Sequence, residues 1–297
     1  MTQTYHANGK LLLTSEYFIL DGAVGLALPT KFGQTLSEET SEENGVFWKS
    51  IDNENKVWFE AKFDEQLDII STSNQEIAST LKNILTHCTL TTQHIQLTTH
   101  LNFPQNWGLG SSSTLISLLA QLSNKNPYQL LEKTFGGSGY DIACATANSA
   151  ILYQVENQER KITPINFQPN FSQHLYFLHL NKKQNSREGI QHYKNLNVDK
   201  APIIEQLNAL TQNIANAIDF DEFCHYLNIH ETIISEALQL PKVKELYFQD
   251  FPYTIKSLGA WGGDFVLVAC NEPQAKIESY FQEKGFSTLL PFDTIIL

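Results

Sequence analysis

The chain has 297 residues, of which 42% are hydrophobic, and this is enough for one large domain or two moderate ones with their own cores. Its 20 Lys and Arg residues against 32 Asp and Glu residues give a net charge of -12, which argues against nucleic-acid or anionic-membrane partners. Four scattered cysteines form no C-x-x-C pair, so no structural zinc site is expected. Without a leader pattern or a membrane-length apolar run, we expect a reduced, cytoplasmic protein.

The first half of the sequence predicts strands and helices around one glycine-rich loop. Alternation of apolar residues and turn signals between them predict strands, and apolar residues three and four apart predict helices. The expected strands are 5–13, 17–20, 24–28, 46–51, 57–63, 94–103 and 150–155, with a tight turn at Asp21-Gly22 and a hairpin turn at 52–55. The expected helices are 74–87, 114–122, 127–135 and 141–147.

The second half mixes strands and helices without regular alternation, which favours an α+β fold over a doubly wound sheet. The polar stretch 157–170 contains two prolines and indicates a domain boundary, which divides the chain into 1–165 and 166–297. Beyond it the expected strands are 175–180, 265–270 and a final strand, and the expected helices are 188–194, 202–218, 221–238, 243–248 and 273–283.

One loop has the composition that phosphate chemistry needs. It leads from a predicted strand into a helix and consists of Pro104, Gln105, Asn106, Trp107, Gly108, Leu109, Gly110, Ser111, Ser112 and Ser113. Glycines let the backbone approach phosphate oxygens, a helix start offers unpaired N–H groups, and serine hydroxyls bind phosphate or magnesium. No Gly-Lys-Ser/Thr ends the loop, so it is not a Walker A motif. Taken alone, a glycine-serine turn with a serine N-cap is an equal alternative.

The pattern P-x-x-x-G-L-G-S-S resembles the nucleotide-phosphate motif of the GHMP kinase superfamily, which includes galactokinase, homoserine kinase, mevalonate kinase and phosphomevalonate kinase. Three further blocks are similar to the family's motifs and occur in the family's order. They are G-K-L-L-L-T-S-E-Y at 9–17, G-S-G-Y-D at 137–141, and S-L-G-A-W-G-G-D at 257–264. Two positions depart from the family pattern, because Ser15 and Trp261 stand where glycine is usual.

The resemblance implies a two-domain α+β fold, with an N-terminal ATP-binding domain, a ferredoxin-like C-terminal domain and the active site in the cleft between them. ATP and Mg²⁺ are the implied cofactors. Asp141 would orient or deprotonate the acceptor hydroxyl, Lys10 would stabilise developing charge, and Ser112 would bind magnesium, with Glu132 as a second ligand. Without the motif context, Lys10 reads as a surface lysine, Asp141 as a helix cap and Glu132 as a solvated helix-end residue.

The substrate side is also implied by resemblance. Asn185-Ser186-Arg187 is similar to the N-T-R step of mevalonate kinases, and Arg187 is one of only two arginines available for a carboxylate or phosphate. An ordinary basic loop is the alternative. The implied substrate-binding residues are Glu16, Tyr17, Ser138, Gly139, Ser186, Arg187, Gly259, Gly262 and Gly263.

Two substrates remain open at this point. Glu16-Tyr17 and the G-S-G-Y-D block resemble phosphomevalonate kinases, whereas Asn185-Ser186-Arg187 resembles mevalonate kinases, and we favour phosphomevalonate slightly. A catalytically silent metabolite-binding homologue is the alternative of another class, and Ser15 and Trp261 are the residues that would betray it. We also hypothesise that the Trp261 ring narrows the cleft. The expected partner is a small molecule, with a homodimer as an open possibility.

Overall fold

The computed structural model of the chain describes residues 2–90, 92–182 and 186–297. The chain forms two compact units, and neither is continuous in sequence. The first unit contains the chain up to Gly9, Phe32–Gln105 and Leu109–Thr146, and the second contains Lys10–Lys31, Asn106–Gly108 and Ala147–Leu297. The mixed content of strands and helices confirms the predicted α+β class. These units are not continuous segments, so they do not test the predicted domain boundary after residue 165, which stays a prediction.

The first unit is built on a mixed sheet. Its strands lie in the order β5-β4-β3-β6-β2, β1 also pairs with β2, and β3 and β6 run parallel to each other. The bounds are β1 (Gln3–Leu12), β2 (Gly25–Thr40), β3 (Val46–Ile51), β4 (Val57–Phe63), β5 (Ile69–Thr72) and β6 (Ile95–Leu101). Buried and half-exposed residues alternate along β3 and β6, so one face of the sheet supplies the core. β1 and β2 each contribute residues to both units.

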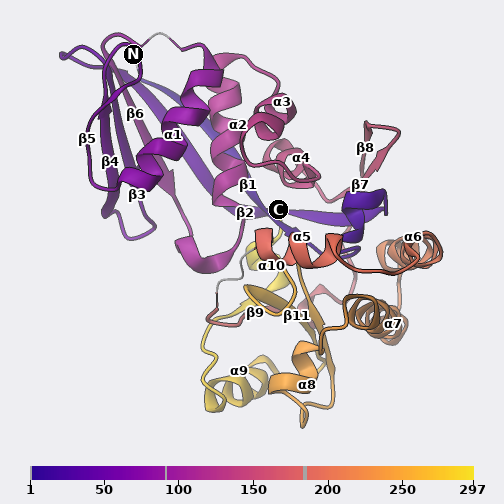
Figure 1. Cartoon of the computed structure of the whole chain (residues 1–297). Helices are drawn as coiled ribbons and strands as arrows, with labels where there is room; N and C mark the ends of the chain where they lie inside the picture. The colour runs from indigo at the N-terminus through magenta and orange to yellow at the C-terminus, as the bar shows by residue number, and fades with distance from the viewer. Residues whose placement is uncertain (1, 91, 183–185) are drawn as a thin grey trace. The chain divides into compact units, whose positions relative to one another are not determined.

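Helices gather on one face of this sheet (Figure 1). They are α1 (Gln75–Cys88), α2 (Ser111–Ser123), α3 (Pro127–Thr134) and α4 (Tyr140–Thr146), and the short 3-10 helix η2 (Gln105–Trp107) precedes α2. Side-chain caps set the starts of two of them: Asn74 accepts from the Ile77 N–H at 3.1 Å, and Asn126 accepts from the Tyr128 N–H at 2.9 Å. Their apolar faces form one core with the sheet, and α2 packs against α4.

The second unit contains an antiparallel sheet in the order β10-β11-β9-β12. Its strands are β9 (Leu175–His179), β10 (Thr254–Ser257), β11 (Phe265–Ala269) and β12 (Leu289–Pro291). Every residue of β9, β10 and β11 is buried, so these strands show no alternation of polarity. In the same unit the beginning of β2 pairs with β7 (Ile151–Glu156), which pairs with β8 (Glu159–Pro164).

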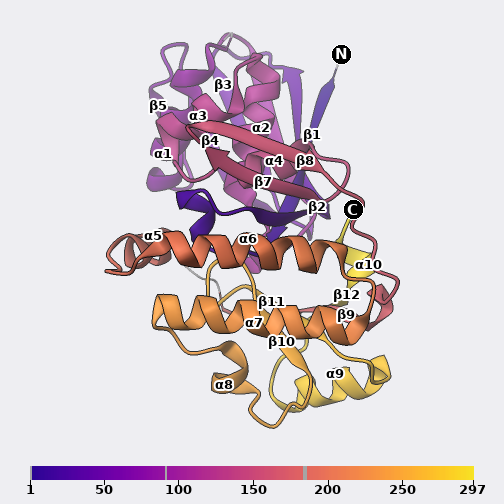
Figure 2. The ribbon, with the colours of Figure 1, turned by 90° about the vertical axis from the view of Figure 1, so that its right-hand side faces the viewer.

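Two long helices lie side by side in the second unit, α6 (Lys200–Asn216) and α7 (Phe220–Leu238) (Figure 2). α7 also packs against β10. Asp199 and Asp219 cap their first turns through side-chain oxygens. The remaining helices are η1 (Phe18–Asp21), η3 (Ser172–His174), α5 (Ser186–Lys194), α8 (Val243–Tyr247), α9 (Gln274–Glu283) and α10 (Phe292–Ile295).

The sequence misplaced a few elements. Residues 17–20 were expected to be a strand, but η1 occupies 18–21 and its N-cap Tyr17 has a positive φ of 62°. The sequence did not predict β8, because this strand is largely exposed and its residues lie in the polar stretch 157–170. It did not predict β10 either, because Lys256 interrupts a short apolar run. Within the described part of the chain, the helices are all too short or too polar to cross a membrane.

Candidate active site

The second half of the predicted phosphate loop has the geometry of an open helix start. Gly110 is the N-cap of α2 with a left-handed φ of 94°, and no side chain caps the helix. The first N–H groups of α2 therefore lack a side-chain partner from the cap, and the helix dipole adds partial positive charge there. Ser112 is exposed at this start, whereas Ser113 is buried and donates to the Gly110 carbonyl at 2.8 Å. Ser112 is thus the serine of this pair that presents its hydroxyl to solvent.

The first half of the loop, from Pro104 onward, is anchored differently. Leu109 is fully buried and belongs to the first unit. Trp107 and Gly108 belong to the second unit, where the Trp107 ring meets the Phe265 ring edge-on with centroids 5.6 Å apart. A Cβ atom on Gly108 would lie 2.2 Å from the Asp264 carboxyl group, and its φ is 67°. The left-handed backbone therefore favours glycine at 108, and the Asp264 carboxyl group would have to move to admit a side chain there.

Lys10 reaches this same place from β1. Its Nζ donates to the Gly108 carbonyl oxygen at 2.9 Å, and the side chain is partly buried. Three sequence blocks, represented by Lys10, Gly108 and Asp264, therefore meet within the second unit. The sequence does not predict Asp264, the last residue of the glycine-rich block, as a site residue. Its position after three glycines in the block was the available signal.

Asp141 lies in the first turn of α4 in the first unit. Its Oδ1 accepts from the Ile142 N–H at 3.0 Å, and the residue is half-buried. Gly137 and Gly139 precede it with φ values of 111° and 90°, so left-handed backbone explains glycine at both positions of the G-S-G-Y-D block. Ser138 lies between them. The catalytic role of Asp141 stays a prediction.

The first motif ends in a buried ion pair. The Glu16 side chain is fully buried, and its Oε1 accepts a hydrogen bond from Lys256 Nζ, which is also fully buried. His230 Nε2 lies 3.8 Å from Glu16 Oε2. Burial raises the pKa of Glu16 to about 7, although the Lys256 ammonium opposes this shift. Glu16 offers no exposed surface to a substrate, so its predicted substrate contact has no support in this structure.

A second buried carboxylate lies beside this pair. Glu231 accepts from the Ser257 N–H at 3.1 and 3.2 Å and from the Ser257 hydroxyl at 2.8 Å. Burial raises the pKa of Glu231, and the Lys256 ammonium again opposes the rise. Lys256 Nζ also donates to the Ser257 carbonyl at 2.8 Å. These contacts hold the strand that leads directly into the glycine-rich block.

His230 and Ser15 complete the buried cluster. His230 Nε2 accepts from the Ser15 N–H at 2.9 Å, which assigns the imidazole as neutral, and burial lowers the pKa of His230 well below its usual range. Ser15 has a left-handed φ of 64°, which explains why glycine is usual at this position of the motif. Its Oγ donates to the Val24 carbonyl at 2.7 Å, and this bond partly offsets the strain.

The second departure from the motif, Trp261, lies inside the second unit. Its side chain is 3% exposed, its Nε1 donates to the Pro241 carbonyl at 3.0 Å, and it packs in an apolar cluster with Tyr17, Phe18 and Tyr193. The hypothesis that this ring narrows an open cleft is therefore wrong, because the ring is buried in the core. Gly259 and Gly262 have φ values of 58° and 82°, and no atom lies within 4 Å of an added Cβ at either position.

The remaining predicted site residues lie on α5 and α3. Arg187 is exposed in the first turn of α5, next to Ser186 at the helix start, and Asn185 lies outside the described residues. Glu132 is exposed on α3. Among the described residues, no three His, Cys, Asp or Glu side chains come together as a ready-made metal site. The magnesium role of Glu132 stays a prediction.

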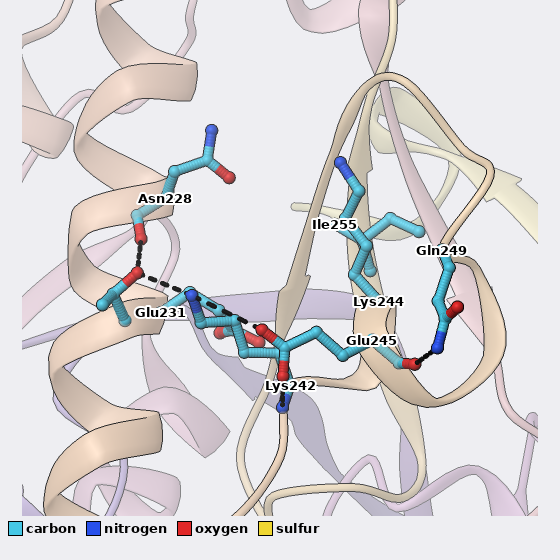
Figure 3. A pocket seen from close by; sticks show the side chains of 8 residues that line it. Asn228, Glu231, Lys242, Lys244, Glu245, Gln249 and Ile255 are labelled. Atoms are coloured by element: carbon cyan, nitrogen blue, oxygen red, sulfur yellow. Dashed lines mark hydrogen bonds and ion pairs between the residues drawn. The ribbon is translucent and has the colours of Figure 1, made fainter.

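A separate cavity of about 360 Å³ lies between α7, α8 and β10 (Figure 3). Glu231 and Ile255 are its buried residues, and Lys242 and Lys244 also line it. Lys242 Nζ donates to Thr232 Oγ1 at 2.8 Å across one side of the cavity. The phosphate loop and the glycine-rich block do not line it, so it is distinct from the candidate active site.

Comparison of the sequence finds no match, whereas comparison of the structure finds similar folds. No protein-family model and no curated protein sequence matches the chain. Among solved structures, L. major mevalonate kinase in complex with R-mevalonate is similar with a TM-score of 0.66 at 15% identity, covering 93% of this chain and 90% of that one. Streptococcus pneumoniae phosphomevalonate kinase, in complex with phosphomevalonate and AMPPNP, gives 0.67 at 17% identity, with 96% and 97% covered. Lactococcus lactis galactokinase complexed with galactose gives 0.69 at 14%, with 96% and 89% covered.

These solved structures span nearly the whole chain, and their identities are low enough that the likeness establishes the fold alone. The chain has the two-domain GHMP kinase fold that its four sequence blocks predicted.

Proposed function

We propose that this chain, which has the GHMP kinase fold, is an ATP-dependent kinase that transfers the γ-phosphate to a small alcohol or phosphate acceptor. The observation that carries the proposal is the uncapped start of α2 at Gly110, with the exposed Ser112 beside it. N–H groups that receive no side-chain cap, the helix dipole and a hydroxyl suit this helix start to nucleotide phosphates.

The residues present fit the two cofactors to different extents. The start of α2 fits the phosphates of ATP for the reasons above. Mg²⁺ commonly keeps several waters and is held by nucleotide phosphates with one or two protein oxygens, and Ser112 and Glu132 are the protein ligands that we propose for it. When bound, the ion neutralises charge on the phosphates.

Lys10 and Asp141 carry the proposed chemistry. Lys10, held at the Gly108 carbonyl, supplies a positive charge at the phosphate loop, where it stabilises negative charge on the transferring group. Asp141 orients the acceptor hydroxyl or accepts its proton. Phosphoryl transfer asks the protein mainly for positioning and charge stabilisation, which these two side chains supply.

Phosphomevalonate is the acceptor that we favour. Glu16-Tyr17 and G-S-G-Y-D resemble phosphomevalonate kinases, and the S. pneumoniae enzyme of that name shares the fold. Mevalonate is the alternative, supported by the resemblance at Asn185-Ser186-Arg187 and by the L. major enzyme. In either case Arg187 is exposed on α5 and carries the charge suited to the acceptor's carboxylate or phosphate.

A silent metabolite-binding homologue is the competing class, and the two departures from the motifs were its main support. Ser15 occupies a left-handed position with a compensating hydrogen bond, and the Trp261 ring is buried away from solvent. Both substitutions are thus accommodated by the fold without removing Lys10, Ser112 or Asp141. This favours the kinase over the silent homologue.

The test is an ADP-release assay with ATP and Mg²⁺ against phosphomevalonate, mevalonate, mevalonate diphosphate, homoserine and galactose. We expect turnover with phosphomevalonate and a loss of several orders of magnitude in Asp141→Asn, with ATP binding by calorimetry retained. Turnover with mevalonate alone would select the alternative acceptor. ATP binding with no turnover across the panel would support the silent homologue, and near-normal turnover in Asp141→Asn would remove this residue from the mechanism.

A further inference from the structure

Tyr17 lies where three predicted substrate-side segments meet in the second unit. It ends the first motif, and its hydroxyl oxygen accepts from the backbone N–H of Trp261 in the glycine-rich block at 3.2 Å. The third segment is α5, which carries Arg187. The side chain of Tyr17 is only 8% exposed, so its ring and hydroxyl are enclosed by these neighbours.

The contact with α5 is made through a glycine. A Cβ atom on Gly189 would lie 2.2 Å from the Tyr17 hydroxyl oxygen, 2.9 Å from Cζ and 3.0 Å from Cε1. Gly189 has ordinary helical backbone, so conformation does not require glycine there, and the space occupied by Tyr17 does. A glycine inside a helix is otherwise unfavourable relative to alanine. The phenol therefore sits directly on the α5 backbone.

Other contacts make Tyr17 a rigid support. Its ring stacks on the Tyr193 ring of α5 with centroids 5.9 Å apart and an interplanar angle of 21°. The Tyr193 hydroxyl donates at 2.6 Å to Oδ2 of Asp21, the last residue of η1, the helix that Tyr17 caps. The Tyr17 backbone is itself held at a positive φ of 62°. Burial raises the pKa of Tyr17 to about 12, so the phenol stays neutral near pH 7.

We propose that Tyr17 is a positioning residue, which seats α5 on its ring through Gly189 and fixes the glycine-rich block through the Trp261 N–H. Arg187 lies two residues before Gly189 on the same short helix, so the seating of α5 sets where its guanidinium group stands. This role in acceptor binding rests on the proposed function. The contact between Tyr17 and Gly189 does not depend on it.

The experiment is a double-mutant cycle in the full-length protein with Gly189→Ala and Tyr17→Phe. Gly189→Ala should lower Tm by several degrees, because the added Cβ atom would clash with Tyr17. Helix propensity alone predicts the opposite, a rise in Tm. Tyr17→Phe removes the atom that an alanine Cβ would strike first but leaves Cζ at 2.9 Å, so the loss caused by Gly189→Ala should be smaller in that background without disappearing. Gln191→Ala, an exposed change on the same helix, is the control and should leave Tm nearly unchanged.

Kinetics separates positioning from mere stability. Gly189→Ala should raise KM for the acceptor at least tenfold while KM for ATP stays within twofold. Arg187→Ala should also raise KM for the acceptor. Combining it with Gly189→Ala should raise this KM little further, because both changes disrupt the same interaction between Arg187 and the acceptor.

The opposing outcomes are distinct. A Tm that rises equally with Gly189→Ala in both backgrounds would overturn the contact itself. Unchanged acceptor KM in a correctly destabilised Gly189→Ala variant would overturn the positioning role. If the wild-type protein turns over no acceptor while the Tm cycle holds, the proposed function fails, and with it the role in acceptor binding, while the contact stands.

Discussion

Lys256 provides the sharpest test of the buried cluster. Lys256→Met would remove the ammonium group that donates to Glu16 and to the Ser257 carbonyl, with little change in side-chain length. Glu231 would keep its three hydrogen bonds from Ser257, but Glu16 would lose the only side-chain donor that the described residues give its Oε1. Breaking a buried ion pair by removing one partner costs about 3–5 kcal/mol, because it leaves an uncompensated buried charge. We expect a loss of this size in the free energy of unfolding at pH 8.

Urea denaturation at pH 6 and pH 8 measures this loss. Without Lys256 the pKa of Glu16 rises further, so Glu16 is protonated at pH 6 and the loss should be smaller there than at pH 8. The double variant Lys256→Met with Glu16→Gln removes both charges and should recover at least half of the loss at pH 8. Lys56→Met, which breaks an exposed ion pair with Glu54, is the matched control and should change stability little.

A Lys256→Met variant whose free energy of unfolding lies within about 1 kcal/mol of wild type at pH 8 would refute a stabilising buried charge pair. A double variant no more stable than Lys256→Met would refute it equally, since the loss would then come from packing rather than from an orphaned carboxylate.

Three further predictions concern the same unit. Ser15→Ala keeps a Cβ atom at a left-handed backbone position and loses the bond to Val24, so the free energy of unfolding should fall by about 1–2 kcal/mol. Ser15→Gly should stay within about 1 kcal/mol of wild type, and chemical denaturation compares the two variants. Trp261→Gly should lose about 3–5 kcal/mol through a core cavity without favouring larger acceptors, and a changed acceptor-size preference at full stability would contradict this. The pKa of Glu16 is raised from 4.5 to about 7 in the folded protein, so its contribution to stability is complete below pH 4.5 and is lost as the pH rises through 7. Over this range the free energy of unfolding of wild type should fall by about 3 kcal/mol relative to that of Glu16→Gln. A difference between the two proteins that does not change with pH would disprove this prediction.

Local patterns were enough to predict most elements. The apolar spacing of α1 and the turn at 52–55 between β3 and β4 are properties of short windows, and the structure places both where they were expected. β10 could not be recognised, because Lys256 looks like a surface residue until its partner is known. That partner, Glu16, lies 240 residues away in the sequence.

The candidate site was predictable where a motif describes backbone. The left-handed glycines at 110, 137 and 139 are visible in the sequence because few other residues tolerate those conformations. The need for glycine at 189 could not be predicted, because it comes from the space that Tyr17 occupies rather than from the φ angle of Gly189. Likewise His230 and Glu231 read as ordinary helical residues of α7, and their burial beside the first motif is a tertiary fact.

The separation between Glu16 and Lys256 also orders events on the ribosome. Chain growth at about 5–20 residues per second puts roughly 10–50 s between the synthesis of the two residues. Every segment of the first unit has been made by residue 146, whereas the second unit waits for its final strands. During that interval Glu16 remains a hydrated, ionised carboxylate, because its partner Lys256 has not yet been synthesised. The emerging chain can therefore complete its first unit well before the first motif is locked in place by the last quarter of the protein.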